Sequence, residues 1–166
     1  MSVVAVYADG GVVRHNPSPY GGIWACCHVD EAGSRTWEDA GWLLPGEFNN
    51  GVVTNNQTEF YALLIALELV PAGWSGRACS DSNVTLLRFF RSGRLNGIPM
   101  RWQHRLGRVL ARLGAVEPVL LSGHPTRSQL AAGVGRGGRP VSEHNVWCDR
   151  RCGELARLVE LPAVAS

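Results

Sequence analysis

The sequence predicts an α/β domain with a mixed five-stranded sheet flanked by helices, in which three antiparallel strands come first and parallel crossovers follow. Two observations favour this class. Three β-like segments, at residues 3–8, 21–29 and 35–44, precede any helical pattern and are joined by short connections. Beyond residue 54, helical patterns alternate with short apolar segments, which is typical of parallel strands joined by crossover helices. We expect the order β-β-β-α-β-α-α-β-α in a single domain over residues 1–166.

The first strand is predicted from an apolar run that ends at Asp9. The second and third strands flank residues 30–34, DEAGS, which have a turn composition. Residues 45–54 are rich in Gly and Asn and should form a loop, and Thr54 or Asn55 can cap the helix that follows. That helix is predicted because four apolar residues recur at the spacing of one helical face. They are Phe60, Leu63, Leu64 and Leu67.

This first helix should end before Pro71. A short strand that ends on an acid is predicted at residues 76–82, and a helix stopped by Gly93 is predicted at residues 83–93. A third, amphipathic helix should begin near Pro99. Its apolar positions are Trp102, Leu106, Val109 and Leu113.

The end of the chain is predicted to contain one more strand and one more helix. The strand is expected at residues 118–123, and a long loop at residues 124–141 follows it. The last helix should run from about Glu143 to about Glu160, with Ser142 as its cap.

Composition argues against a membrane-spanning protein and does not by itself indicate a nucleic-acid binder. The chain is 45% hydrophobic and 18% charged, its net charge is +2, and it has no apolar run of about 18 residues. The N-terminus lacks a signal-peptide pattern, so we expect a cytoplasmic protein. All 16 basic residues are Arg, which is well suited to phosphate contacts, although biased genomic base composition explains the same usage.

The five cysteines are predicted to be free thiols in the core. Their spacing contains no C-x2-C pair of the zinc-binding kind, and an odd number in a cytoplasmic protein argues against a disulfide framework. Cys148 and Cys152 share a helical stripe with Leu155, which is the pattern of a core-facing side. The other three are Cys26, Cys27 and Cys79.

Four acids occupy positions that suggest a metal site. Asp9 and Asp81 end predicted strands, and Glu59 and Asp149 lie near the starts of predicted helices. Because strand ends and helix starts meet at one edge of an α/β sheet, we expect the four carboxylates to lie close together. They would repel one another unless cations lay between them, and oxygen ligands favour Mg²⁺ or Mn²⁺ over zinc. Each acid taken alone also fits a turn or a helix-dipole role.

The order and spacing of several motifs resemble those of type 1 ribonuclease H, from about residue 3 to about residue 160. The most specific pairing is TNN-x-x-E before an apolar helix, with SDS about 20 residues later. The full set comprises DGG at residues 9–11, NP at 16–17, TNNQTEFYALLIALE at 54–68, SDS at 80–82, GH at 123–124 and N-x-x-C-D-x-x-x-x-E-L-A at 145–156.

The resemblance implies an endonuclease that hydrolyses the RNA strand of RNA–DNA hybrids and leaves 5′-phosphate and 3′-hydroxyl ends. It implies that Asp9, Glu59, Asp81 and Asp149 are catalytic and bind two Mg²⁺ ions, or Mn²⁺ in their place, with Asp9 bridging both. It also assigns His124 to proton transfer or product release. An oligomer is not implied, and we expect a monomer. The resemblance implies substrate contacts in the minor groove for Asn16, Asn55, Asn56 and Asn83, and we expect Gly10 and Gly11 to leave room beside the metals for the phosphate backbone of the substrate.

The sequence departs from the family pattern in three places. Gly11 stands where the family usually has Ser, and the basic helix of some bacterial members is missing. The loop at residues 124–141 is long and contains GVGRGGRP, which we do not interpret as a dinucleotide motif because it neither follows a strand closely nor opens a helix. We interpret it as a flexible loop that closes over the hybrid backbone. Seven arginines either replace the phosphate contacts of the missing basic helix or form a solvated face. They are Arg88, Arg91, Arg94, Arg101, Arg105, Arg108 and Arg112.

Three alternative functions stay open at this point. A 3′–5′ exonuclease of a related fold usually needs D-x-E on its first strand, whereas position 11 is Gly here. A junction resolvase also uses four acids but fits the TNN motif poorly. A non-catalytic hybrid-binding module would have no need of all four acids.

Overall fold

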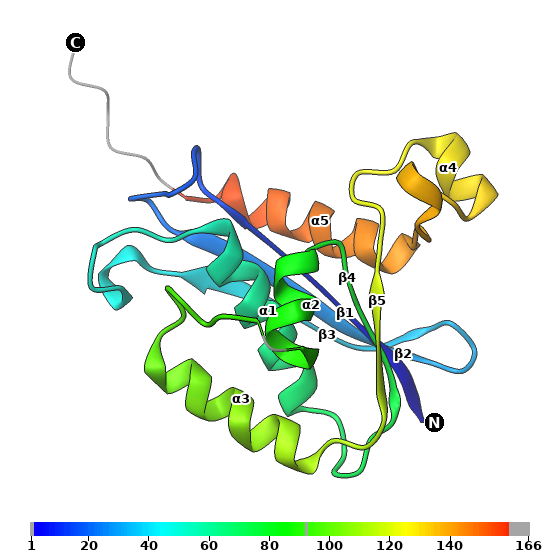
Figure 1. Cartoon of the computed structure of the whole chain (residues 1–166). Helices are drawn as coiled ribbons and strands as arrows, with labels where there is room; N and C mark the ends of the chain where they lie inside the picture. Colours follow the sequence, from blue (N-terminus) through cyan, green and yellow to red (C-terminus); the bar gives the residue numbers. More distant parts are fainter. Residues whose placement is uncertain (1, 92, 160–166) are drawn as a thin grey trace.

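The computed structural model describes residues 2–91 and 93–159. The chain forms a five-stranded sheet with helices on both faces (Figure 1). None of the helices described is both long and apolar enough to cross a membrane. The strands are β1 (Val3–Val12), β2 (Gly22–Asp30), β3 (Arg35–Leu43), β4 (Gly76–Ser80) and β5 (Val116–Leu120). The α-helices are α1 (Asn55–Glu68), α2 (Asn83–Phe90), α3 (Met100–Arg112), α4 (Arg127–Ala132) and α5 (Glu143–Ala156), and 3₁₀ turns lie at Pro45–Glu47 and Arg136–Gly138.

The sheet is mixed, and its strand order is β3-β2-β1-β4-β5. β1 pairs antiparallel with β2, and β2 pairs antiparallel with β3. β4 lies parallel to β1 on the other side, and β5 lies parallel to β4, because helices connect these strands. This arrangement confirms the predicted fold class of an antiparallel meander followed by parallel crossovers.

The prediction that the first strand ends at Asp9 was wrong. β1 continues to Val12, since Asp9 pairs with Ala25 and the next three residues also keep their partners on β2. The pairing with β4, in contrast, stops at Tyr7. Asp9 therefore lies inside β1, just beyond the point where the neighbouring parallel strand leaves it.

Other predicted boundaries also differ from the structure. The fifth strand lies at Val116–Leu120 rather than 118–123, and Pro118 is tolerated because β5 is an edge strand. The second helix ends at Phe90 rather than near Gly93. The predicted loop at 124–141 contains α4, whose capping box (Thr126 with Gln129) begins a helix too short to show periodicity. The last helix ends at Ala156, whereas the predicted end at Glu160 lies outside the described residues.

The two faces of the sheet carry separate cores. From Ala5 onward, even-numbered residues of β1 and β2 belong to the core that α1, α2 and α3 cover, and odd-numbered residues belong to the core that α5 covers, as the strand period of two requires. Val3 and Val4 have the opposite facing, because the register of β1 shifts between Val3 and Ala5. α1 is buried over most of its surface because it lies between the sheet and α3 (Figure 1). The five cysteines are all free and buried, which confirms that they pack the core. Cys26 lies on the α1 side, and Cys27, Cys79, Cys148 and Cys152 lie on the α5 side.

Several arginines that we considered as phosphate contacts have structural roles instead. Nε and Nη2 of Arg105 donate to both carboxylate oxygens of Glu68, each at 2.7 Å. Arg112 donates to the carbonyls of Leu67 at 2.8 Å, Val70 at 2.5 Å and Glu68. These carbonyls close the C-terminal end of α1, where backbone acceptors lack helical partners. Arg88 similarly donates to the carbonyls of Arg94 and Asn96.

We expect Arg112→Gln to destabilise the fold, because it leaves carbonyls at the end of α1 without their charged donor. The loss should be about 1–3 kcal/mol in the free energy of unfolding. Arg108→Gln is the matched control, since Arg108 is exposed on the same helix, and its effect should stay within about 0.5 kcal/mol. Urea denaturation measures both, and equal stabilities would contradict the role we give Arg112.

Candidate metal centre

Three carboxylates from different elements meet at the edge of the sheet. Oxygen atoms of Asp9 on β1, Glu59 on α1 and Asp81 after β4 all lie within 4.8 Å of one another. The strand register explains why Asp9 and Asp81 lie close together, since Tyr7 pairs with Cys79 and each acid comes two residues after its member of this pair. β4 ends there while β1 continues beside β2, so a crevice opens where the sheet changes from antiparallel to parallel pairing.

Gly10 allows α1 to approach β1 closely enough to bring Glu59 to this crevice. A Cβ atom at Gly10 would lie 2.5 Å from Oγ1 of Thr58 and 2.6 Å from the backbone nitrogen of Glu59. At Gly11 a Cβ atom would meet nothing within 4 Å. Adjacent glycines therefore have different roles, and there is room at Gly11 for the Ser that the family usually has.

We expect Gly10→Ala to destabilise the protein by about 1–3 kcal/mol, because the added methyl group forces α1 away from β1. The same displacement should weaken metal binding, since Glu59 moves with α1. Gly11→Ala is the matched control and should change neither property. Denaturant unfolding and calorimetric titration with Mn²⁺ measure the two effects, and identical behaviour of the two variants would refute the close-contact explanation.

Asp149 and His124 complete the wall of the same cavity. This cavity has a volume of about 490 Å³, and all four predicted acids line it together with His124. Asp149 lies on α5 with its side chain half exposed, outside the tight group formed by the other three acids. Nδ1 of His124 lies 3.5 Å from Oδ2 of Asp149, and His124 has a positive φ of 47°.

Burial and mutual repulsion make the negative charge of this site costly. Burial raises the pKa of Asp9 well above its usual value, and the nearby carboxylates of Asp81, Asp149 and Glu59 raise it further. The pKa of Glu59 is raised to about 7, mainly by burial, although a hydrogen bond from Ser82 opposes this shift. Burial also raises the pKa of Asp81, against a hydrogen bond from Asn145. A bound divalent cation would relieve these costs, and an all-oxygen donor set fits Mg²⁺ or Mn²⁺.

The structure brings some of the predicted substrate residues to the cavity and not others. Gly10, Gly11, Asn16 and Asn55 line it, and the backbone nitrogen of Asn55 donates to Oδ1 of Asn16 at 3.1 Å. Asn56 and Asn83 do not line it. Both are exposed in the first turns of α1 and α2, so any contact they make lies outside this cavity.

Sequence reasoning missed several residues around the site. Arg14 and His15 line the cavity, and the guanidinium carbon of Arg14 lies 5.5 Å from the centre of the Tyr20 ring. Ser82 and Asn145 lie within the matched motifs but hold carboxylates rather than metal. Nothing in the sequence distinguishes Arg14, because its place in the cavity depends on how the chain turns after β1.

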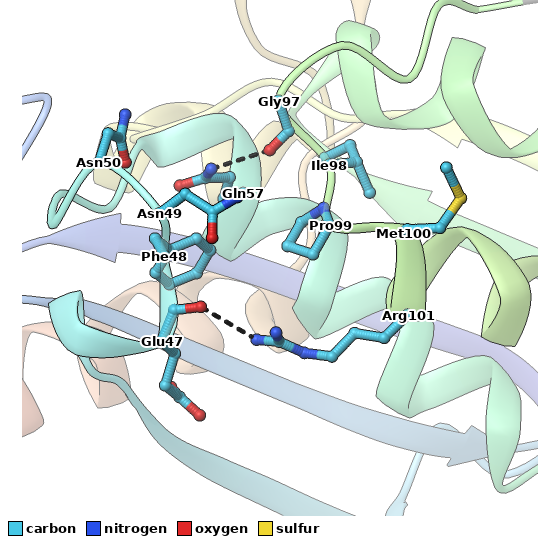
Figure 2. A pocket seen from close by; sticks show the side chains of 10 residues that line it. All are labelled: Glu47, Phe48, Asn49, Asn50, Gln57, Gly97, Ile98, Pro99, Met100 and Arg101. Carbon is cyan, nitrogen blue, oxygen red and sulfur yellow. Dashed lines mark hydrogen bonds between the residues drawn. The ribbon is translucent and has the colours of Figure 1, made fainter.

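A larger cavity of about 570 Å³ lies elsewhere, between the loop after β3 and the segment before α3 (Figure 2). Nε2 of Gln57 donates to the carbonyl of Gly97 at 2.9 Å across it, and Nη2 of Arg101 approaches the carbonyl of Glu47 at 3.5 Å. Glu47 is the one acid among its lining residues. Because it brings no carboxylates together, we assign the metal centre to the smaller, acidic cavity.

Several solved structures with the same fold are ribonucleases H. The N-terminal RNase H domain of a Mycobacterium tuberculosis protein is 17% identical over 94% of this chain and 96% of that chain, with a TM-score of 0.59. LC11-RNase H1, isolated from compost by a metagenomic approach, is 18% identical over 95% and 97%, with a TM-score of 0.59. RNase H1 from the halophilic archaeon Halobacterium salinarum is 24% identical over 70% and 84%, with a TM-score of 0.53. LC11-RNase H1 has also been solved in complex with an RNA/DNA hybrid.

Sequence comparisons add no family assignment, since neither a family model nor a curated protein sequence matches the chain. At these identities the structural similarity defines the fold alone. The chain therefore has the ribonuclease H-like fold, which confirms the resemblance at the level of structure.

Proposed function

We propose that this protein is a metal-dependent endonuclease that hydrolyses the RNA strand of RNA–DNA hybrids. The observation that carries the proposal is the group of Asp9, Glu59 and Asp81 within 4.8 Å, with Asp149 in the same cavity, on a ribonuclease H-like fold. The products would carry 5′-phosphate and 3′-hydroxyl ends. The four acids all come from one chain, so the proposal needs no partner subunit.

The acids would hold two Mg²⁺ ions, which Mn²⁺ could replace. Asp9, Glu59 and Asp81 are close enough to share one cation, and Asp149, which lines the same cavity, would help to hold the second one. Bound ions of this kind stabilise the charge that develops on the attacking and leaving oxygens of a phosphodiester. The chain itself contributes fixed ligands, because strand pairing and helix packing hold these side chains before substrate binds.

His124 is suited to moving a proton at the mouth of the cavity. Its side chain is 82% exposed and lies beside Asp149, so one ring nitrogen faces a carboxylate while the ring stays open to water and substrate. We assign it to proton transfer or product release.

Asn16, Asn55 and Arg14 would hold the substrate. Side-chain amides both donate and accept hydrogen bonds, which suits the recognition of a 2′-hydroxyl in a minor groove. Arg14 is exposed at the cavity and suits a phosphate oxygen. We extend the substrate-contacting role to Asn56 and Asn83 only for the part of the hybrid that lies beyond the cavity.

A cleavage assay tests the proposal directly. Labelled RNA–DNA hybrid, double-stranded DNA, double-stranded RNA and single-stranded RNA are each incubated with the protein and Mg²⁺ or Mn²⁺. We expect cleavage of the hybrid RNA strand alone, and loss of that cleavage in Asp81→Asn. Absence of hybrid cleavage, or equal activity in the variant, would overturn the proposal.

A further inference from the structure

The segment between β5 and α5 is a folded lobe rather than an open loop. We call residues 125–141 the arginine lobe. It contains α4, whose start is closed by the reciprocal Thr126–Gln129 capping box, and whose end is closed by Gly133 in a left-handed conformation. Val134 and Pro140 form a β-bridge across its base. Figure 1 shows the lobe beyond the end of β5 and next to the start of α5.

Three consecutive residues join the arginine lobe to the metal centre. The buried Ser122 donates its backbone N–H to the carbonyl of Pro140 at 2.9 Å, and its hydroxyl accepts from the backbone of Arg136 at 3.1 Å. Gly123 packs on Asp81, since a Cβ atom there would lie 2.7 Å from Oδ2 of that residue. His124 then lies beside Asp149. The lobe is thus held at a set position next to the acidic cavity.

The arginine lobe carries three arginines that form no ion pair with the described residues. No acid occurs between Glu117 and Glu143 in the sequence. Arg127, Arg136 and Arg139 are exposed, and within residues 2–91 and 93–159 their guanidinium groups form no ion pair. The arginines with structural roles differ from these three in burial and in hydrogen bonding. Arg105 and Arg112 are part-buried, and their guanidinium groups donate hydrogen bonds to a carboxylate or to backbone carbonyls.

We propose that the arginine lobe is a second phosphate-binding surface, which contacts the nucleic-acid backbone beyond the cleavage site on the side of His124. This inference rests on the proposed function and extends it. A polyanion that passes over the acidic cavity needs compensating positive charge close by, and exposed guanidinium groups bind phosphate oxygens in a bidentate manner. The lobe is pinned through Ser122, so it acts as a fixed contact, in place of the closing loop that the sequence suggested.

The salt dependence of hybrid binding tests this inference. Fluorescence anisotropy with a labelled RNA–DNA hybrid gives Kd over a range of salt concentrations. The measurement is made in Ca²⁺, and gels check that the RNA strand stays intact. Each of Arg127→Gln, Arg136→Gln and Arg139→Gln should lower the slope of log Kd against log salt by about 0.9. With Mg²⁺, KM for the hybrid should rise while kcat stays unchanged. Arg77→Gln, at an exposed position at the far end of β4, is the matched control and should change neither quantity.

The outcomes separate this inference from the proposed function. If all three lobe variants keep the wild-type slope and KM, the inference is overturned even where the wild-type protein cleaves hybrids. If the wild-type protein binds nucleic acid without cleaving it, the proposed function fails, and the slopes still decide the role of the lobe. Point substitutions are preferred to deleting residues 128–138, because the deletion would also raise KM by releasing Ser122 and thereby His124.

Discussion

Asp9→Asn is expected to abolish hybrid cleavage, with a loss of at least about 10³-fold in kcat. Asp9 is the most buried of the four acids, and it is the one that interacts with all the other three. Removing its charge therefore weakens the attraction for every cation in the site. Single-turnover cleavage of a labelled hybrid in Mg²⁺ measures the loss, and Asp39→Asn, an exposed position on β3, should keep wild-type activity.

The same substitution should make the metal-free protein more stable at pH 8. Burial and the neighbouring carboxylates raise the pKa of Asp9, so its charged form costs folding free energy that a neutral amide does not. Asn also keeps the oxygen that accepts from the backbone N–H of Gly10 at 2.9 Å. A less stable Asp9→Asn protein, or one with normal activity, would contradict the view that this carboxylate exists to bind metal.

The metal-free protein should lose stability as the pH rises from about 5 to about 8, and Mg²⁺ should restore it at the upper end. The pKa of Glu59 is about 7 in the folded protein and 4.5 in the unfolded reference. Between these values the folded state keeps a proton that the unfolded chain has released, so the free energy of unfolding falls as the pH rises. At about 1.4 kcal/mol per pKa unit, Glu59 accounts for up to roughly 3 kcal/mol of this loss. Asp9 adds to it in the same direction.

Thermal or urea unfolding in EDTA and in Mg²⁺, at several pH values, measures this linkage. Glu59→Gln should flatten the pH dependence in EDTA, because the amide has no proton to lose. The gain from Mg²⁺ should be large at pH 8 and small at pH 5, where protons compete with the cation for the carboxylates. The opposite result would be a metal-free wild-type protein that gains more stability between pH 5 and pH 8 than the Glu59→Gln variant does. It would show that the pKa values of these carboxylates are not raised.

The elements that the sequence predicted best were those indicated by two or more independent local patterns. The helix of α1 combines apolar periodicity with the Thr54 cap, and both are present in the structure. The alternation of strands and helices was enough to predict the mixed sheet. Boundaries were less well predicted, because β1 continues past Asp9 through pairing with β2, and no local property of Gly10 or Gly11 reveals that partner.

The roles of the arginines on α3 could not be predicted from the sequence. Arg101, Arg105, Arg108 and Arg112 have the same helical spacing, and the sequence could not distinguish a solvated face from a phosphate contact. The structure gives Arg105 and Arg112 partners on α1 and leaves Arg108 exposed. The partners that decide these roles lie 37 and 45 residues away along the chain, beyond the reach of any local pattern.

Periodicity, composition and motif spacing can be read along the chain, and they were sufficient to predict the fold class, the burial of the cysteines and the four acids of the site. The three-dimensional structure was needed to show that Asp9, Glu59 and Asp81 form a tight group while Asp149 lies half exposed beside His124. It also decided that residues 125–141 form a lobe pinned to Ser122. Those distances depend on strand register and on how closely α1 approaches Gly10, and both are set by contacts between residues far apart in the chain.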